Sequence, residues 1–254
     1  MTDTTSNAPA GLTGAAAGAL VGAAIIGLAF VLPERSPDGR SLPLSFLFGA
    51  AFGVVLQRAR FCFFCVTRDF LDKRDPRGLL GIVTAIAVGL IGYHLVFGAW
   101  LPVPNAPRLP PDAHIGPVSW VLALGAFAFG LGMAISGSCI SAHLYRLGEG
   151  AMASPVALLG AAFGFVLGFM SWNTLYLGAI QEAPVLWLPH YLGYAGSLAL
   201  QLAVLAAIAL WLLRHPWPVE PRPESPMEAI FRRRWPAHLG GVLIGALAVL
   251  AYLR

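Results

Sequence analysis

The sequence predicts an all-α integral membrane protein with about seven transmembrane crossings, two of them broken or re-entrant helices that carry cysteines. Three observations predict this fold class. Of the 254 residues, 57% are hydrophobic and only 11% are charged, whereas a soluble domain carries about a quarter charged residues. Apolar runs long enough to cross a bilayer core recur along the chain. Two of these runs are interrupted by polar residues just before a cysteine.

Taken in order, the apolar segments differ in whether they are continuous. Residues 12–32 form a first span, long enough for a bilayer core of about 30 Å. Residues 42–66 are interrupted at Arg58–Arg60 into pieces too short to span singly, and residues 118–147 are interrupted at Ser136–Ser138. Paired discontinuous segments are typical of a transporter's binding site. The remaining segments are continuous, and they are residues 79–101, 155–177, 191–213 and 237–253.

The basic residues are unevenly distributed among the predicted loops. The loop Arg68–Arg77 carries four lysines and arginines, and Arg214–Arg234 carries five. Loops rich in these residues lie on the cytoplasmic side of a membrane. If both interrupted segments cross, both basic loops lie inside, which predicts a cytoplasmic N-terminus. If these segments are hairpins that return to their own side, the count of seven crossings no longer holds. Crossing and re-entry therefore both stay open.

The two interrupted segments resemble each other. Residues 51–53 (AFG) precede Cys62 as residues 128–130 (AFG) precede Cys139, with the same nine-residue spacing from glycine to cysteine. A basic residue and a complete span follow each cysteine. We therefore expect an internal repeat that brings Cys62 and Cys139 towards a common axis. The repeat halves are approximately residues 42–101 and 118–178, within a single transmembrane domain of residues 1–254.

Two motifs in these segments resemble those of a known family. Residues 58–62 (RARFC) resemble the first cysteine motif of the YeeE/YedE sulfur-transport family. Residues 130–139 (GLGMAISGSC) with residues 144–150 (LYRLGEG) look like its second motif. Two departures are Ile140, where the family more usually has a small residue or proline, and Cys65, which has no counterpart in the repeat. The resemblance implies a bacterial inner-membrane permease that takes up thiosulfate or a related sulfur compound.

The resemblance also implies roles for particular residues and partners. In that family, cysteine thiols along a narrowed central path pass the anion by S–H···S hydrogen bonds, and Cys62 and Cys139 are the matching positions. The implied partners are a small sulfur-containing anion, the lipid bilayer and a cytoplasmic sulfur-carrier protein. The sequence contains no Walker A or GxGxxG phosphate loop, so we expect a permease without a cofactor rather than an enzyme. The net charge of +4 is too modest to indicate nucleic-acid binding.

The residues before and at the second cysteine suit an anion. Cys139 follows Gly137 and Ser138 and is expected to begin a half-helix, whose free N–H groups and partial positive charge favour an anion. Ser136, Gly137 and Ser138 add hydroxyl or amide donors. The competing interpretation is structural, because buried cysteines pack as small apolar residues and small residues pack helices in membranes. The predicted substrate path is Cys62, Cys139, Ser136, Gly137 and Ser138.

Residues beside the first cysteine could support this path. Cys65 lies three residues after Cys62, on the same face if the segment is helical, and we interpret it mainly as a packing residue. Arg58 and Arg60 could attract an anion, or could equally lie at the membrane interface beside the basic loop.

Two residues after the second cysteine could also support the path. His143 lies four residues after Cys139, on the same helical face, and is interpreted as a hydrogen-bonded packing residue rather than a ligand. Arg146 is expected to pair with Glu149 near the cytoplasmic end of the segment.

Two other functions stay open on the sequence. A membrane thiol oxidoreductase would use Cys62 and Cys65 as a redox pair. A soft-metal carrier would gather thiols and an imidazole, although a single Cys-x-x-Cys pair does not complete a zinc site and no resident metal is predicted. The residues that such a carrier would use are Cys62, Cys65, Cys139 and His143.

Overall fold

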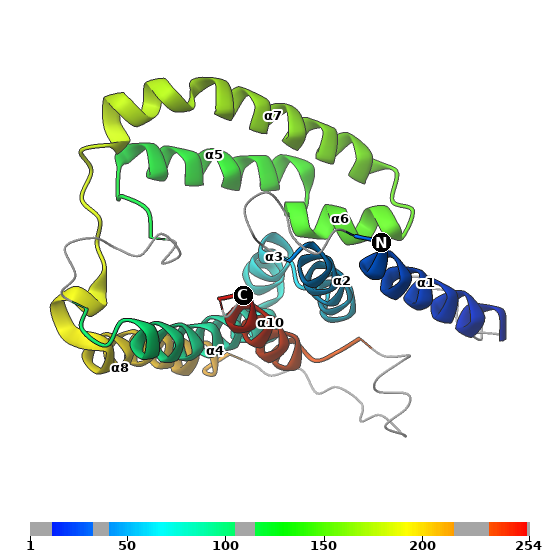
Figure 1. Cartoon of the computed structure of the whole chain (residues 1–254), viewed down its shortest axis with the longest axis horizontal. Coiled ribbons are helices and arrows are strands. Elements are labelled where there is room, and N and C mark those ends of the chain that lie inside the picture. The colour runs from blue at the N-terminus through cyan, green and yellow to red at the C-terminus, as the bar shows by residue number, and fades with distance from the viewer. Residues whose placement is uncertain (1–11, 33–40, 105–114, 216–233, 253–254) are drawn as a thin grey trace. The chain divides into compact units, whose positions relative to one another are not determined.

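A computed structural model of the chain describes residues 12–32, 41–104, 115–215 and 234–252. All regular secondary structure within these ranges is helical (Figure 1), as the sequence predicts. The helices are α1 (Leu12–Val31), α2 (Leu42–Ala59), α3 (Phe63–Lys73), α4 (Arg77–Trp100), α5 (Trp120–Ser136), α6 (Ile140–Gly148), α7 (Ala153–Leu175), the π-helix η2 (Tyr176–Ile180), α8 (Leu188–Leu212) and α10 (Ala237–Tyr252).

Several of these helices match the dimensions of a membrane. Within the described ranges, five helical segments are long and apolar enough to cross one, and two shorter apolar helices accompany them. Many large apolar side chains on these segments are exposed, which suits contact with lipid. The five segments are Leu42–Lys73, Arg77–Trp100, Trp120–Gly148, Ala153–Ile180 and Leu188–Leu212, and the shorter helices are Gly18–Val31 and Ala237–Tyr252.

The finer parts of the topology stay predictions. Seven crossings require both shorter helices to span as well. The orientation rests partly on the basic loop Arg214–Arg234, most of which lies outside the described residues. The chain divides into two compact units, Met1–Phe52 and Gly53–Arg254, which are described separately. The first holds α1 and the start of α2, and the second holds every residue of the candidate site.

The first basic loop begins later than we predicted. Residues Arg68–Lys73 belong to α3, which ends where Arg74 adopts a left-handed conformation at φ 57°. Phe70 explains the extension, because its buried ring packs 5.5 Å from the Trp211 ring on α8, centroid to centroid. Burying this ring stabilises the last turn of α3.

Helix α4 packs closely along α10. Glycines make this approach possible, because a Cβ atom on Gly241 would collide with the backbone carbonyl of Gly81. One turn further on, a Cβ on Gly245 would lie 2.7 Å from the carbonyl oxygen of Ala85. The two backbones therefore touch, which is how helices associate in lipid without a hydrophobic driving force.

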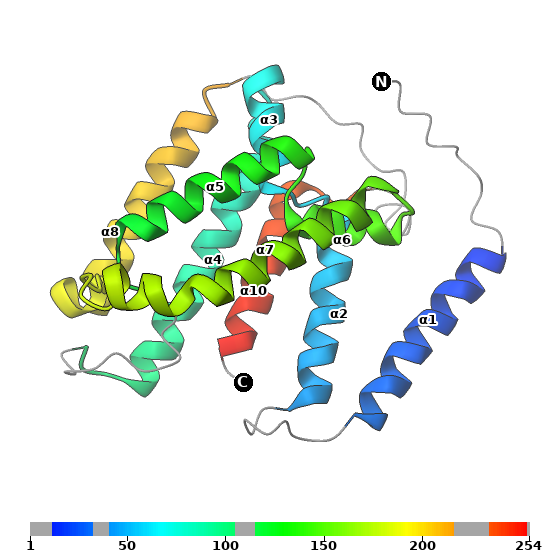
Figure 2. The ribbon, with the colours of Figure 1, turned by 90° about the horizontal axis from the view of Figure 1, so that it is seen from above.

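Helix α8 contacts α4 as well, and Figure 2 shows α4 between α8 and α10. A buried polar network joins α4 to α8. The Nδ1–H of His94 donates to the carbonyl of Leu90 at 2.9 Å, which leaves Nε2 to accept from the Ser197 hydroxyl at 3.2 Å. Gln201 donates to the same hydroxyl oxygen at 2.7 Å. These polar groups satisfy one another, as groups between membrane helices must.

Candidate functional site

Both interrupted segments break in the same way. Helix α2 ends at Ala59 and α5 ends at Ser136, and the next residue of each segment, Arg60 at φ 51° and Gly137 at φ 73°, is left-handed. That conformation suits glycine and is uncommon for arginine. In both segments the left-handed residue lies two positions before a cysteine. The breaks therefore fall where the sequence places its charged and glycine-serine interruptions.

Each cysteine then caps a short helix. Cys62 is extended at φ −140° and precedes α3, and Cys139 is extended at φ −79° and ψ 165° and precedes α6. This confirms that Cys139 begins a half-helix, and it gives Cys62 the same position. The sulfur of Cys62 also accepts a hydrogen bond from the backbone N–H of Cys65 at 3.3 Å, which satisfies one of the free donors of the first turn.

The two capping cysteines are in contact although 77 residues separate them. The Cys139 thiol donates to the Cys62 sulfur across 3.3 Å. Both residues are buried, at 3% and 1% exposure, and Ala142 completes the buried cluster. All three cysteines of the chain are free thiols. The structure thus brings together the two residues that we expected on a common axis.

The electrostatics of this contact follow from the two helices that meet there. Because the cysteines cap α3 and α6, the N-termini of both half-helices converge on the thiol pair. Each helix N-terminus carries partial positive charge, roughly half an elementary charge on a full macrodipole. Two such ends and two thiols thus meet with no fixed charge among the innermost groups, an arrangement whose chemistry suits an anion.

One hydroxyl contacts the thiol pair, and two others lie close by in the same segment. The Cys139 sulfur lies 3.0 Å from Ser141 Oγ, and the Ser136 hydroxyl donates to the carbonyl of Ser138 at 2.9 Å. Ser138 is itself 1% exposed, and its Oγ lies 3.8 Å from the Cys65 sulfur. Of the expected path residues, Cys62, Cys139 and Ser138 are buried together, while Ser136 is exposed and Gly137 supplies the turn.

The prediction that Arg146 pairs with Glu149 is wrong. The Glu149 carboxylate instead binds Arg60 at 2.9 Å and accepts from Gln57 at 3.2 Å. The left-handed turn at Arg60 places this guanidinium beside α6, where it also lies 5.6 Å from the Tyr145 ring centroid. Glu149 therefore joins the two interrupted segments to each other.

The substitution Glu149→Gln removes this charge while keeping the shape of the side chain. We expect it to destabilise the purified protein by about 0.5–1 kcal/mol, because the pair with Arg60 is only partly exposed, at 36% and 29%. The melting temperature in detergent measures this loss. Asp69→Asn is the matched control, since its partner Lys73 is 72% exposed. Equal melting temperatures for the two variants would contradict a role for Glu149 in joining the segments.

His143 is placed away from the thiols. Its Nδ1 lies 3.4 Å from Ser154 Oγ, and its Nε2 is buried without a hydrogen-bond partner among the described residues. One ring nitrogen therefore makes a hydrogen-bonded contact of the kind expected for a packing histidine, and the role of His143 stays a prediction. Within the described ranges, no three histidine, cysteine or acidic side chains gather closely enough to hold a metal ion.

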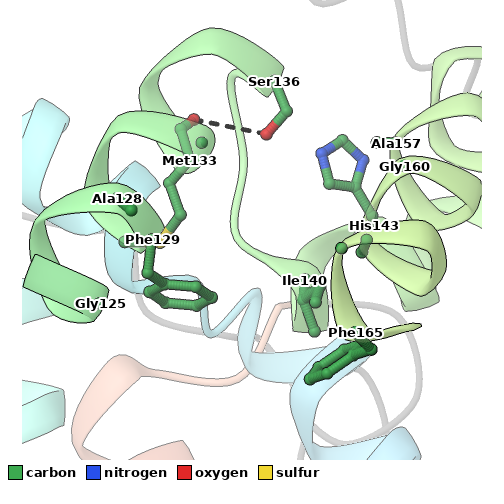
Figure 3. Close-up of a pocket in the computed structure, with 13 residues that line it drawn as sticks. Gly125, Ala128, Phe129, Met133, Ser136, Ile140, His143, Ala157, Gly160 and Phe165 are labelled. Carbon is green, nitrogen blue, oxygen red and sulfur yellow. Dashed lines mark hydrogen bonds between the residues drawn. The ribbon is translucent and has the colours of Figure 1, made fainter. Parts of the chain in front are cut away.

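His143 also lines a cavity of about 730 Å³ between α5, α6 and α7. Figure 3 shows its ring and Ser136 on the cavity wall, with the rings of Phe129 and Phe165 at the far side. Small residues of α5 and α7 form most of the remaining wall, which are Gly125, Ala128, Gly132, Ala157, Gly160, Ala161 and Gly164. The cavity is thus mainly apolar and separate from the thiol pair.

Two polar residues of the site were not expected from the sequence. Ser141 lies beside the Cys139 sulfur and Gln57 binds Glu149, and each is a polar residue in an otherwise apolar part of an interrupted segment. That pattern could have identified them. The Arg58 carbonyl accepts a hydrogen bond from the backbone N–H of Trp235 at 3.1 Å. For its side chain, anion attraction and a position at the membrane interface both stay predictions.

Comparison with known proteins gives this site a family context. The chain is 29% identical over 220 residues to the thiosulfate transporter TsuA of Escherichia coli (strain K12), covering 80% of this chain. It is 33% identical over 139 residues, or 54% of this chain, to the thiosulfate transporter TsuA of Spirochaeta thermophila. It is 28% identical over 156 residues, or 61% of this chain, to the probable transporter YedE of Salmonella typhimurium.

These relatives are longer than the matched region. The alignments cover 58%, 40% and 36% of their respective lengths. The family match itself is described as sulphur transport, and it extends over residues 58–254 of this chain. It therefore includes both capping cysteines, both short helices and the bundle of α4, α8 and α10. The chain belongs to the sulphur-transport family.

Proposed function

We propose that this chain is a permease for thiosulfate or a related small sulfur-containing anion. The observation that carries the proposal is the 3.3 Å contact between the Cys62 and Cys139 sulfurs, at the meeting point of two half-helix N-termini. Thiols donate to soft sulfur acceptors, and helix N-termini stabilise anions. Relatives named as thiosulfate transporters support this choice of ligand.

The transport step follows from the chemistry of the thiol pair. The Cys139 thiol donates a hydrogen bond to the Cys62 sulfur, and in this proposal that contact closes the path until an anion arrives. An arriving anion replaces the Cys62 sulfur as the acceptor, and the two thiols then donate to it in turn. Such hydrogen bonds are weak, and conduction needs binding that is weak enough at each position for the ion to leave.

The same proposal includes the finer topology. Seven crossings, a cytoplasmic N-terminus and a bacterial inner-membrane location accord with the two basic loops. The matching breaks before Cys62 and Cys139 support the internal repeat and a single transmembrane domain. On the cytoplasmic side, a sulfur-carrier protein would receive the anion.

The oxidoreductase alternative has one supporting observation, the hydrogen bond from the Cys65 backbone to the Cys62 sulfur. It predicts a reversible disulfide between Cys62 and Cys65. Alkylation and mass spectrometry during turnover distinguish the two functions. Three thiols that stay free would exclude the oxidoreductase.

The proposal is tested by uptake of ³⁵S-labelled thiosulfate in bacterial cells that lack other sulfate and thiosulfate importers. We expect the chain to restore uptake and growth on thiosulfate as the sulfur source, because the path binds the anion by its terminal sulfur. Labelled sulfate, which has no terminal soft sulfur, is the control and is expected to enter poorly. Thiosulfate uptake no greater than in cells with the empty vector would contradict the proposal.

A further inference from the structure

Arg146 is a cation beside the thiols that has no carboxylate partner in the part of the chain that the structure describes. Glu149, the acidic residue that caps the end of α6 three positions after Arg146, is bound by Arg60 and Gln57 instead. Within the described residues, the Arg146 side chain makes one hydrogen bond and no ion pair. A guanidinium has five N–H donors, so most of its donors are left for a ligand. A half-buried positive charge of this kind attracts an anion.

The one hydrogen bond of Arg146 leads directly to the thiol cluster. Its Nη1 donates to Ser138 Oγ at 2.6 Å, and Ser138 is 1% exposed. Because Arg146 donates to this oxygen, Ser138 keeps its own hydroxyl proton as a donor, either to the Cys65 sulfur at 3.8 Å or to a ligand. A hydroxyl that accepts from a cation becomes a stronger donor. Ser138 therefore presents a polarised O–H group at the site.

This hydroxyl lies next to the sulfur atoms. Ser138 Oγ is 3.8 Å from the Cys65 sulfur, and the Cys65 backbone N–H binds the Cys62 sulfur at 3.3 Å. Cys62 in turn accepts from Cys139. These residues form one connected cluster with two halves. The first half holds the thiol donors, and the second holds the Arg146 guanidinium and the Ser138 hydroxyl. The second half matches the donors that bind oxyanions.

We propose that Arg146 and Ser138 form an oxyanion subsite, which selects sulfur anions that carry oxygen atoms as well as a terminal sulfur. This inference rests on the proposed function and specifies its ligand. A thiosulfonate group fits both halves, since its outer sulfur accepts from the thiols and its oxygens accept from Arg146 and Ser138. Hydrosulfide offers nothing to the oxyanion subsite, and sulfate offers nothing soft to the thiols.

The test compares KM and maximal rate of thiosulfate uptake in Arg146→Gln, Arg146→Lys and the original chain. Arg146→Gln is expected to raise KM at least about tenfold, the size of a charged hydrogen bond, with a smaller effect on maximal rate. Arg146→Lys keeps the charge and restores part of the affinity. Lys73→Gln removes an equal charge from an exposed position of α3 and should leave KM unchanged. If Arg146 were only structural, Arg146→Gln would instead lower the maximal rate and the amount of protein in the membrane.

Competition by hydrosulfide tests the selectivity itself. Relative to thiosulfate, hydrosulfide is expected to inhibit Arg146→Gln more strongly than the original chain, because only thiosulfate uses the subsite. An unchanged KM in Arg146→Gln, or no gain in relative inhibition by hydrosulfide, would overturn the subsite while leaving the permease intact. Absence of thiosulfate uptake by the original chain would instead overturn the proposed function, and the subsite with it.

Discussion

Cys139→Ala is expected to reduce thiosulfate uptake at least about tenfold and to abolish growth on thiosulfate as the sulfur source. The variant removes the donor of the 3.3 Å bond to Cys62, at the point where two helix N-termini meet. Removing one donor to a charged ligand costs roughly 1.5–3 kcal/mol of binding, and each 1.4 kcal/mol corresponds to about a factor of ten in affinity. Initial rates of ³⁵S-thiosulfate uptake, normalised to protein in the membrane, measure the effect.

Ser171→Ala is the control for this variant. The Ser171 hydroxyl binds only carbonyl groups of its own helix, those of Leu167 at 3.0 Å and Gly168 at 3.1 Å. Its removal deletes one polar atom outside the site, so uptake should match that of the original chain. Full uptake by Cys139→Ala would remove the thiol pair from the transport step, whatever the chain transports.

The second large effect is expected on folding. Gly241→Ala places a Cβ atom against the backbone carbonyl of Gly81 and 3.2 Å from the backbone nitrogen of Ala85. Backbone atoms move less readily than side chains, so the cost is expected near the upper end of the range of roughly 1–3 kcal/mol for overpacking. The amount of monodisperse protein after size-exclusion chromatography, and its melting temperature, should both fall.

Gly89→Ala is the matched control, because it also replaces a helical glycine with alanine, on α4 rather than α10, but has open space at that position. Alanine is a better helix former than glycine, so this variant should be as stable as the original chain or slightly more so. If Gly241→Ala melted at the same temperature as Gly89→Ala, the close contact of α4 with α10 would be contradicted.

The positions of the helices and of their breaks could be predicted from the sequence. Long apolar runs predict spans by length alone, and the interruptions at Arg58–Arg60 and Ser136–Ser138 coincide with the observed breaks. The approach of Cys62 to Cys139 was also predictable, because two segments with equal glycine-to-cysteine spacing are expected to fold alike. The breaks follow from the local sequence, and the approach of the two cysteines follows from the similarity of the two segments.

The partners of the charged side chains could not be predicted in this way. Spacing along one segment suggested that Arg146 pairs with Glu149. The cation that binds the Glu149 carboxylate is instead Arg60, 89 residues away. Its position depends on the left-handed turn at the first break, which favours glycine and is not signalled by an arginine. The extension of α3 was missed for a similar reason, because it depends on the packing of Phe70 against another helix.

The central claim is that the Cys62 and Cys139 thiols meet on the transport path. It is tested most directly by oxidising the membrane-embedded chain with copper phenanthroline while thiosulfate uptake is followed. A disulfide requires the sulfurs to move from 3.3 Å to about 2.05 Å. We predict a disulfide between Cys62 and Cys139 by peptide mapping, with loss of uptake that dithiothreitol reverses. Thiols that do not cross-link, or a cross-linked chain that still takes up thiosulfate, would contradict the claim.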